Sequence, residues 1–484
     1  GRAESDELAV VVAALCGSPL QGRIGVGWAT ARIEGSATEP SLSVSAMDEL
    51  IDSLAAAHGD GVQAERRRLL DDFGARATVE EADFVVRLLT GEMRQGALAG
   101  VVESAVAKAE GVPVGVVRRA AMLNGDLPAT AVLGRTGGRA TLQAVRLRLG
   151  VPVSPMLAST APSVDEAVAD LGPSSVQWKL DGIRVQAHVR GDRVRLFTRA
   201  LNDITDRLPG IVSELAALDL PATVLDGEAI GEGADGRPAM FQDTVSDGTD
   251  SGDSESAGIE TGAESGETAG WVMKAHWFDV LHHDGTDLLD EPLAARLTVL
   301  DAIAGHDRVE SQETDDPSAA QSVLDASLAA GHEGVVLKDL GSPYAAGRRG
   351  KAWRKVKPVH TIDLVVMGVE WGSGRRQGTL SNLHLGALGP DGTPVMVGKT
   401  FKGLTDELLA WQTEQLLARE TSRDGHIVWV RPELVVEIAL DGVQRSTRYP
   451  GGVALRFARV RRYREDKSPS QADTIEAVRA LLPT

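Results

Sequence analysis

The short stretch KLDGIR, from Lys179 to Arg184, combines a lysine, an acid and an arginine around one glycine. A lysine acts as a covalent nucleophile only as the neutral amine, and an ordinary pKa of about 10.4 keeps it charged near neutral pH. Cationic neighbours or a bound metal lower that pKa. Because Arg184 is such a neighbour, Lys179 is a candidate nucleophile whose site should contain further positive charge.

Further cations and two acids follow in strand-like stretches. Lys338 ends HEGVVLK, and period-two alternation in WRKVK puts Lys355 and Lys357 on one strand face. Such a set of cations would hold a polyphosphate, and a divalent metal would need oxygen ligands. The candidate ligands are Glu228 in VLDGEAI and Glu333 in HEGVVLK, because a charge that interrupts an apolar strand is costly without a partner.

Each of these motifs has a plainer interpretation when taken alone. KLDG is more often a hairpin turn than a site, and a basic run is usually a solvated surface. The series is more informative, because its members occur in one chain with strand character throughout. In order they are KLDGIR, FTR, LDGE, WFDV, EGVVLK, WRKVKP and LRFARVRRYREDK.

Residues 1 to about 150 carry apolar residues at helical spacing, which predicts a helical bundle. In TVEEADFVVRLL, Thr78 and Glu81 have the spacing of a capping box, so a helix should begin there. Its predicted apolar face comprises Phe84, Val85, Leu88 and Leu89. No catalytic spacing occurs in this part of the sequence.

From about residue 151 to 358, short strands alternate with helices. The stretches VQWKL, IRVQAHVR and RVRLFTR are separated by Asp-Gly and Gly-Asp pairs, which predicts consecutive hairpins. Period-two alternation places Gln177 and Lys179 on one face of the first strand. Residues 243–270 hold eight acids, no Lys or Arg and little apolar content, which predicts a mobile loop.

After Pro358, strand patterns recur in IDLVVMGVEW, LHLGALG, PVMVGKTF, HIVWVR, LVVEIAL and VALRFARV. One helical stretch, TDELLAWQTEQLLARE, falls between the third and the fourth. Five or six short strands with one interposed helix predict a small closed barrel of the OB type, a fold often used on nucleic acid strands.

Composition and charge set the class of protein. A chain of 484 residues exceeds one ordinary core and predicts about three domains. The single cysteine, Cys16, and the short apolar run AVVVAALC predict a cytoplasmic protein with neither signal peptide nor membrane anchor. The net charge of −19 disfavours nucleic acid contact, but residues 243–270 contribute −8 of it and six basic residues cluster in 344–357.

The ordered series resembles the covalent nucleotidyltransferase superfamily and, more closely, the ATP-dependent DNA ligases, including actinobacterial ones with a helical N-terminal domain. This resemblance implies a multidomain fold: an all-α DNA-binding domain over 1–150, an α+β nucleotidyltransferase domain of ATP-grasp-like antiparallel sheets over 151–358, and a β-barrel OB domain over 359–484. The implied reaction seals 5′-phosphate/3′-hydroxyl nicks in duplex DNA, with ATP as co-substrate and Mg²⁺ or Mn²⁺. The implied enzyme is a nucleoid-associated monomer that encircles nicked DNA.

The resemblance also assigns roles to single residues. Lys179 would attack the α-phosphorus of ATP and form a lysyl-AMP intermediate. Glu228 would bind ribose or metal, Glu333 would bind metal, and Phe278 in WFDV would stack on adenine. The remaining implied contacts with the nucleotide are Arg184, Arg199, Lys338, Arg349, Lys355 and Lys357.

Two further groups lie outside the middle domain. Arg464, Asp466 and Lys467 match the motif that closes over pyrophosphate in the first step, which implies rotation of the OB domain about the Pro358 region. In GEMRQGALAG, Arg94 matches a contact with the DNA backbone.

The sequence departs from the family pattern at two places. Gln177 stands where these ligases commonly have glutamate, although its amide oxygen can still accept from the adenine amino group. The acidic stretch 243–270 replaces basic and aromatic residues expected there, so a DNA contact in that stretch is in doubt.

Three alternatives remain open. An mRNA capping enzyme shares the KxDG motif and the OB domain, but it has no need of about 150 helical residues. An RNA ligase differs in its substrate and is separated by assays on nicked DNA and nicked RNA. A catalytically silent DNA-binding clamp would have no reason to keep Lys179, the two acids and the phosphate-binding lysines together.

Overall fold

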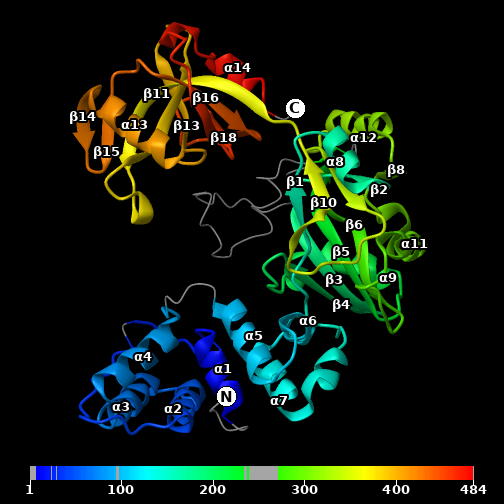
Figure 1. Ribbon diagram of the computed structural model, residues 1–484, viewed down its shortest axis with the longest axis vertical. Helices are drawn as coiled ribbons and strands as arrows, with labels where there is room; N and C mark the ends of the chain where they lie inside the picture. Colours follow the sequence, from blue (N-terminus) through cyan, green and yellow to red (C-terminus); the bar gives the residue numbers. More distant parts are fainter. Residues whose placement is uncertain are drawn as a thin grey trace.

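The structure is a computed structural model that describes residues 7–22, 24–28, 30–93, 98–233, 237–238 and 271–482. Arg94 and the acidic stretch 243–270, which is predicted to be a mobile loop, lie outside these residues. Figure 1 shows helices at the N-terminal end of the chain, mixed sheets and helices in the middle, and a β-rich C-terminal region. Among the described helices, none combines the length and the apolar character needed to cross a membrane.

In the described part of the N-terminal region, seven helices pack into two clusters that share α1 (Figure 1). One core joins α1 to α2–α4, and the other joins α1 to α5–α7. The helices are α1 (Leu8–Leu15), α2 (Val44–Ala56), α3 (Val62–Gly74), α4 (Val79–Thr90), α5 (Leu98–Ala109), α6 (Val114–Asn124) and α7 (Leu127–Gln143).

Helix α4 shows how local sequence sets an element. The predicted capping box is confirmed, since the Thr78 hydroxyl accepts from the Glu81 N–H and the Glu81 carboxylate accepts from the Thr78 N–H. Val85 and Leu88 are buried as expected. The inclusion of Phe84 in the apolar face is wrong, because its side chain is 37% exposed.

The middle region consists of two five-stranded sheets, ordered β1-β10-β9-β2-β8 and β4-β3-β5-β6-β7. Most neighbours are antiparallel, but β1 and β10 are parallel. The strands are β1 (Leu157–Thr160), β2 (Ser174–Trp178), β3 (Ile183–Arg190), β4 (Arg193–Thr198), β5 (Thr223–Gly233), β6 (Trp271–His283), β7 (Thr286–Asp287), β8 (Ser311–Thr314), β9 (Val335–Asp339) and β10 (Arg349–Val356). The helices among the described residues of this region are α8 (Val164–Leu171), α9 (Pro209–Ala217), α11 (Leu293–Ala304) and α12 (Pro317–Ala329).

One predicted hairpin is confirmed and the other is wrong. Strands β3 and β4 pair directly across Gly191-Asp192. Strands β2 and β3 belong to different sheets, so Asp181-Gly182 links two sheets instead of turning a hairpin. Gly182 is required at this link, because a Cβ there would lie 2.1 Å from the carbonyl oxygen of Ala229. The nucleophile candidate Lys179 therefore lies at a crossing between sheets.

The C-terminal region is built on a seven-stranded sheet and a separate two-stranded hairpin, β17–β18. Helix α13 (Asp406–Leu417) falls between the strands formed by PVMVGKTF and HIVWVR, as predicted. The strands are β11 (His360–Trp371), β12 (Leu380–Leu388), β13 (Pro394–Thr400), β14 (Glu420–Asp424), β15 (Ile427–Val430), β16 (Val435–Leu440), β17 (Gly442–Arg445), β18 (Val453–Arg456) and β19 (Arg459–Tyr463), and α14 (Ile475–Arg479) follows them.

The stretch VALRFARV is not the single strand that its pattern predicts. It is broken into β18 and β19 at Phe457, whose φ of +51° lies in the left-handed region. A non-glycine residue adopts that conformation only at some cost. The break separates Arg456, which binds Asp181, from Arg461 and Arg462, which bind Glu437.

A buried core joins the two sheets of the middle region. It contains Trp353 from β10, Val224 from β5 and Leu281 from β6, together with Val153 and Met156 from the segment that precedes β1. The charged residues of the candidate site lie beside this core, near the C-terminal end of β2.

Candidate active site

Backbone hydrogen bonds hold the KLDG and HEGVVLK motifs side by side. The Lys179 N–H donates to the Gly334 carbonyl at 2.8 Å, and the Glu333 N–H donates to the Lys179 carbonyl at 3.1 Å. The Lys179 ammonium forms an ion pair with the Glu333 carboxylate, and Nζ of Lys357 lies 3.8 Å from the other oxygen of that carboxylate. Charged groups from three separate motifs therefore meet at one point.

The charge balance around Lys179 differs from the expectation. Burial lowers the pKa of the Lys179 ammonium, but Glu333, Glu228 and Asp181 outweigh burial, so the pKa lies above its ordinary value. Burial acts to raise the pKa of Glu333, yet Lys179 and Lys357 bring it below the ordinary value. The expected lowering of the Lys179 pKa by cations is therefore wrong for this arrangement, and the lysine is held as a charged partner of Glu333.

Glu228 on β5 faces the same turn. One of its carboxylate oxygens accepts from the Gly182 N–H at 3.3 Å. Burial raises the pKa of the Glu228 carboxyl to about 7, although Arg184 and Lys179 act in the opposite direction. This acid is therefore the less strongly paired of the two predicted metal ligands.

Arg184 on β3 is fixed against an acid and an aromatic ring. Its Nε and Nη2 each lie 2.6 Å from an oxygen of Asp226, which is completely buried. Its guanidinium carbon lies 4.5 Å from the ring centre of Phe278. Two predicted nucleotide contacts, Arg184 and Phe278, thus adjoin each other within reach of Glu228.

Lys338 on β9 lies deeper than expected of a polyphosphate ligand. The residue is only 2% exposed, and its ammonium donates to the Phe278 carbonyl at 3.1 Å. It lies 4.1 Å from the ring centres of both Phe278 and Trp353, and burial lowers its pKa to about 7. In this position the lysine supports the aromatic ring from within the protein.

Gln177 and Lys355 complete the group on the first sheet. Gln177 is 1% exposed and donates to the Ser175 hydroxyl at 3.2 Å. Lys355 on β10 is partly buried, and burial together with Lys357 and Lys179 lowers its pKa. Gln177 pairs with Val336 on β9, and so does Lys355, which places the two residues on strands that flank the same partner.

Comparisons with known proteins identify this assembly. Three family models match the chain: "DNA ligase N terminus" over residues 28–107, "ATP dependent DNA ligase domain" over 155–357 and "ATP dependent DNA ligase C terminal region" over 376–467. A curated relative from Rhodococcus opacus, "Probable DNA ligase", is 52% identical over 486 residues, covering 100% of this chain and 94% of the relative. The chain belongs to the ATP-dependent DNA ligases.

Other relatives of this ligase agree with that assignment. The "Probable DNA ligase" of Nocardia farcinica is 51% identical, with 99% of this chain and 94% of the relative covered. A solved structure named "Pmar-Lig_PreS3" matches with a TM-score of 0.57 over 94% of this chain and 91% of that chain. At 20% identity, the match supports a shared multidomain fold with a helical N-terminal region and a β-rich C-terminal region.

Several predicted site residues of the ligase lie apart from Lys179 and its neighbours. Arg199, just after β4, is exposed, and its side chain has no hydrogen bond or ion pair with the residues described. Arg349, at the start of β10, is also exposed and its side chain makes none with them, but it lies near enough to Lys355 to help lower the pKa of that lysine. Arg464 and Lys467 both bind Asp363 on β11, at 2.9 and 2.6 Å. Arg464 also pairs with Asp466.

The C-terminal region instead approaches the site with residues that the sequence did not indicate. Arg456 at the end of β18 donates to both oxygens of Asp181, at 2.7 and 3.4 Å. Asp441, just before β17, lies 2.5 Å from Nζ of Lys357. Phe457 follows Arg456 and is 52% exposed. In LRFAR, Phe457 lies between two arginines, which could have indicated an exposed contact surface. The apolar alternation of the stretch instead predicted an ordinary strand.

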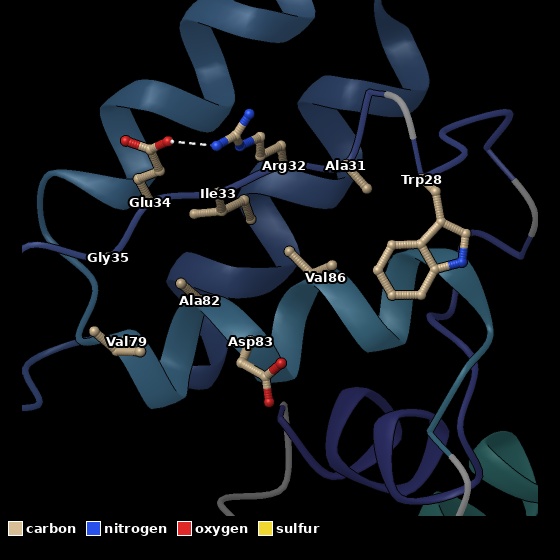
Figure 2. A pocket seen from close by; sticks show the side chains of 10 residues that line it. All are labelled: Trp28, Ala31, Arg32, Ile33, Glu34, Gly35, Val79, Ala82, Asp83 and Val86. Carbon is tan, nitrogen blue, oxygen red and sulfur yellow. Dashed lines mark ion pairs between the residues drawn. The ribbon is translucent and has the colours of Figure 1, made fainter.

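A separate cavity of about 580 Å³ lies in the N-terminal region, between α4 and residues 31–35, with Trp28 also lining it (Figure 2). Trp28 stands at one end of it and Val79 at the other. The ten residues that line it include none of those predicted for the ligase site.

Proposed function

We propose that Lys179 is the nucleophile of the ligase. Its amine attacks the α-phosphorus of ATP, a P–N bond forms, and pyrophosphate leaves with the electrons of the broken P–O bond. The AMP then passes to the 5′-phosphate of a nick in duplex DNA, and the adjacent 3′-hydroxyl attacks that phosphate and releases AMP. The observation that carries this proposal is the meeting of Lys179, Glu333 and Lys357 at the crossing between two sheets.

The Lys179–Glu333 ion pair defines what must happen before the attack. Because the ammonium is not nucleophilic, it must lose its proton and separate from the carboxylate. Glu228, with a pKa of about 7, lies beside the same turn and is partly protonated near neutral pH. When the phosphates of ATP and their counter-ions arrive, Glu333 therefore has to give up its ion pair with Lys179, whereas Glu228 has to lose a proton.

Glu228 and Glu333 are the residues that would hold a divalent cation. The described residues contain no group of three or more His, Cys, Asp or Glu side chains able to hold a metal by themselves. This donor set fits Mg²⁺, which is usually bound by one or two carboxylates together with the phosphates of a substrate. When bound, such an ion supplies positive charge that offsets the phosphate oxygens.

The nucleotide would lie against Phe278, with adenine on the ring and Arg184 near the sugar and phosphates. Gln177 offers an amide oxygen to the adenine amino group, and Arg199 offers a further charge. Lys355, Lys357 and Arg349 would neutralise phosphate, since catalysis of phosphoryl transfer depends mainly on positioning and charge. Lys338 would act indirectly, by holding the Phe278 ring.

The division of the chain into a DNA-binding domain (1–150), an adenylation domain of the nucleotidyltransferase type (151–358) and an OB domain (359–484) belongs to the same proposal. Arg456 of the C-terminal region binds Asp181, two residues after Lys179, whereas Arg464 and Lys467 are bound to Asp363. For Arg464 and Lys467 to reach pyrophosphate, the C-terminal region must rotate about residues near Pro358. The enzyme would encircle nicked DNA as a monomer, with Arg94 on the backbone.

Intact mass of the purified protein, measured before and after incubation with ATP and Mg²⁺ and then with pyrophosphate, tests the nucleophile. The expected result is a gain of one AMP that pyrophosphate reverses and that Lys179→Ala lacks. A protein that gains no AMP from ATP would be a DNA-binding clamp. Preference for nicked RNA over nicked DNA in a sealing assay would indicate an RNA ligase.

A second assay separates the two faces of the C-terminal region. Arg464→Ala and Lys467→Ala should block attachment of AMP but spare the sealing of nicks that already carry AMP. Equal loss of both steps would contradict the role proposed for this motif.

A further inference from the structure

A seven-residue segment joins the helical region to β1, and its backbone is bonded to one side of β3. We call residues 150–156 the strap. Alternate side chains of β3 point to the same face and reach the strap in turn. The contacts are Arg184 Nη2 to the Met156 carbonyl (3.4 Å), Gln186 to both the N–H (2.9 Å) and the carbonyl (3.1 Å) of Val153, and the Gly150 N–H to His188 Nδ1 (3.0 Å).

The strap is therefore a fixed part of the middle region. Val153 and Met156 are completely buried in the core that joins the two sheets. Pro152 and Pro155 have no backbone N–H, so two donors that would need partners are absent. Held by these bonds and by its two core residues, the strap offers a rigid reference for side chains that touch its end.

One hydroxyl connects the end of the strap to the partner of Arg184. The Tyr344 hydroxyl accepts from the Met156 N–H at 2.9 Å and donates to an oxygen of Asp226 at 2.6 Å. Tyr344 is 4% exposed and Asp226 is completely buried. Asp226 in turn holds Nε and Nη2 of Arg184. A continuous series of bonds thus runs from the strap through Tyr344 and Asp226 to Arg184.

We propose that Tyr344 is a positioning residue for the Arg184 guanidinium. By anchoring Asp226 to the strap, its hydroxyl fixes the plane of the carboxylate and hence the place of the guanidinium beside Phe278. An arginine that is held in advance loses less conformational freedom when it binds its ligand. The inference rests on the proposed contact of Arg184 with ATP, and it adds to that contact the residues that prepare it.

Tyr344→Phe removes the hydroxyl while leaving the ring against Trp353. Loss of one hydrogen bond to a charged group should raise the apparent KM for ATP in AMP attachment about tenfold, with a maximal rate changed by less than about threefold. Thr223→Val is the matched control, because the Thr223 hydroxyl is also buried in the same region and donates to the Pro221 carbonyl at 2.8 Å. It should lower thermal stability to a similar extent and leave the KM unchanged.

A double-variant comparison separates positioning from a general loss of stability. In an Arg184→Lys background the bidentate contact with Asp226 is already lost, so adding Tyr344→Phe should change the KM by less than about twofold. An unchanged KM in Tyr344→Phe alone, or the full tenfold effect in the Arg184→Lys background, would overturn the inference.

Gln186→Met gives an independent variant, since it frees Val153 of the strap without touching Tyr344 or Arg184. It should raise the KM for ATP by about threefold. An unchanged KM would show that the strap does not help to position Arg184. Failure of the unmodified protein to gain AMP would instead contradict the proposed function, so the two outcomes are distinguishable.

Discussion

The middle region contains two buried ion pairs that are built in opposite ways. Arg296 and Asp279 are both completely buried, and the guanidinium binds both carboxylate oxygens, at 2.7 and 3.0 Å, and the carbonyls of Glu291 and Ser342. Lys179 and Glu333 are partly exposed, and Glu333 is shared with Lys357. The first pair is satisfied on every side, whereas the second pair has neighbours that compete for the same oxygens.

The difference separates a permanent contact from an exchangeable one. An arginine presents five donors in a fixed plane and is always charged, so it suits a permanent ion pair. The Arg296–Asp279 pair joins α11 to β6 and to the loop before Tyr344. A lysine is a compact charge on a flexible stem, and its pKa shifts with its surroundings. In these two pairs, arginine thus forms the contact that holds the fold together, and lysine forms the contact that a substrate can displace.

The largest effect is expected at the exchangeable pair. Lys179→Ala should abolish attachment of AMP, because it removes the amine that is proposed to form the P–N bond. Glu333 keeps Lys357 as a partner in this variant. Its free energy of unfolding should change by no more than about 1 kcal/mol. Intact mass and urea denaturation measure the two quantities. Lys351→Ala, an exposed lysine on β10, is the control and should still gain AMP.

Breaking the permanent pair, Arg296–Asp279, should lower stability but leave the attachment of AMP intact. Arg296→Ala leaves the Asp279 carboxylate buried without its partner, which costs about 3 to 5 kcal/mol of unfolding free energy. Denaturant titration measures this loss, and the fraction that remains folded should still gain AMP. Arg308→Ala removes a more exposed pair with Asp301 and should cost at most about 1 kcal/mol. Equal losses in the two variants would contradict the distinction.

The third prediction concerns Glu228, which lies near the exchangeable pair but forms no ion pair with the residues described. Its pKa of about 7 in the folded protein exceeds the ordinary 4.5, so the folded state keeps a proton that the unfolded state releases between those values. Stability should therefore fall by about 2 to 3 kcal/mol as pH rises from 4.5 to 7. Glu228→Gln should remove that part of the decline. Identical pH profiles of the two proteins would show that Glu228 titrates normally.

The smallest effect is expected for a pair of intermediate kind, Arg456–Asp181, which joins the C-terminal region to the turn that carries Lys179. Arg456→Ala should slow sealing of nicks by the AMP-charged enzyme about tenfold, equivalent to about 1.4 kcal/mol, and leave AMP attachment unchanged. Single-turnover assays separate the two steps. Arg423→Ala, which removes a pair confined to the C-terminal region, should leave both unchanged.

The sequence predicted the local features well because they depend on neighbouring residues. The Thr78–Glu81 capping box, helix α13 and the β3–β4 hairpin all follow from spacing within a dozen residues. Lys179, Glu333 and Lys357 were found as motifs, and the structure brings them together. The order of the motifs along the chain also identified the family.

The features that the sequence missed depend on pairing over long distances. Spacing could not show that β2 and β3 enter different sheets, since Asp-Gly also favours a hairpin. The sign of the Lys179 pKa shift depends on how close Glu333 lies relative to the cations, and no motif contains that distance. The break at Phe457 was hidden because a residue in the left-handed region can end a strand while the sequence keeps its alternation of apolar and polar residues.

The parallel pairing of β1 with β10 has a mechanical consequence. The chain passes from the strap into the start of β1 and leaves the middle region at the end of β10. These two points lie at opposite ends of the ribbon formed by β1 and β10, whose longer strand, β10, is roughly 25 Å long. Tension between the helical and C-terminal regions would load this ribbon in shear, with its rungs sharing the force instead of opening one after another. Force on a ligase held at both flanks would thus reach the strands beside Lys355 as a sliding stress.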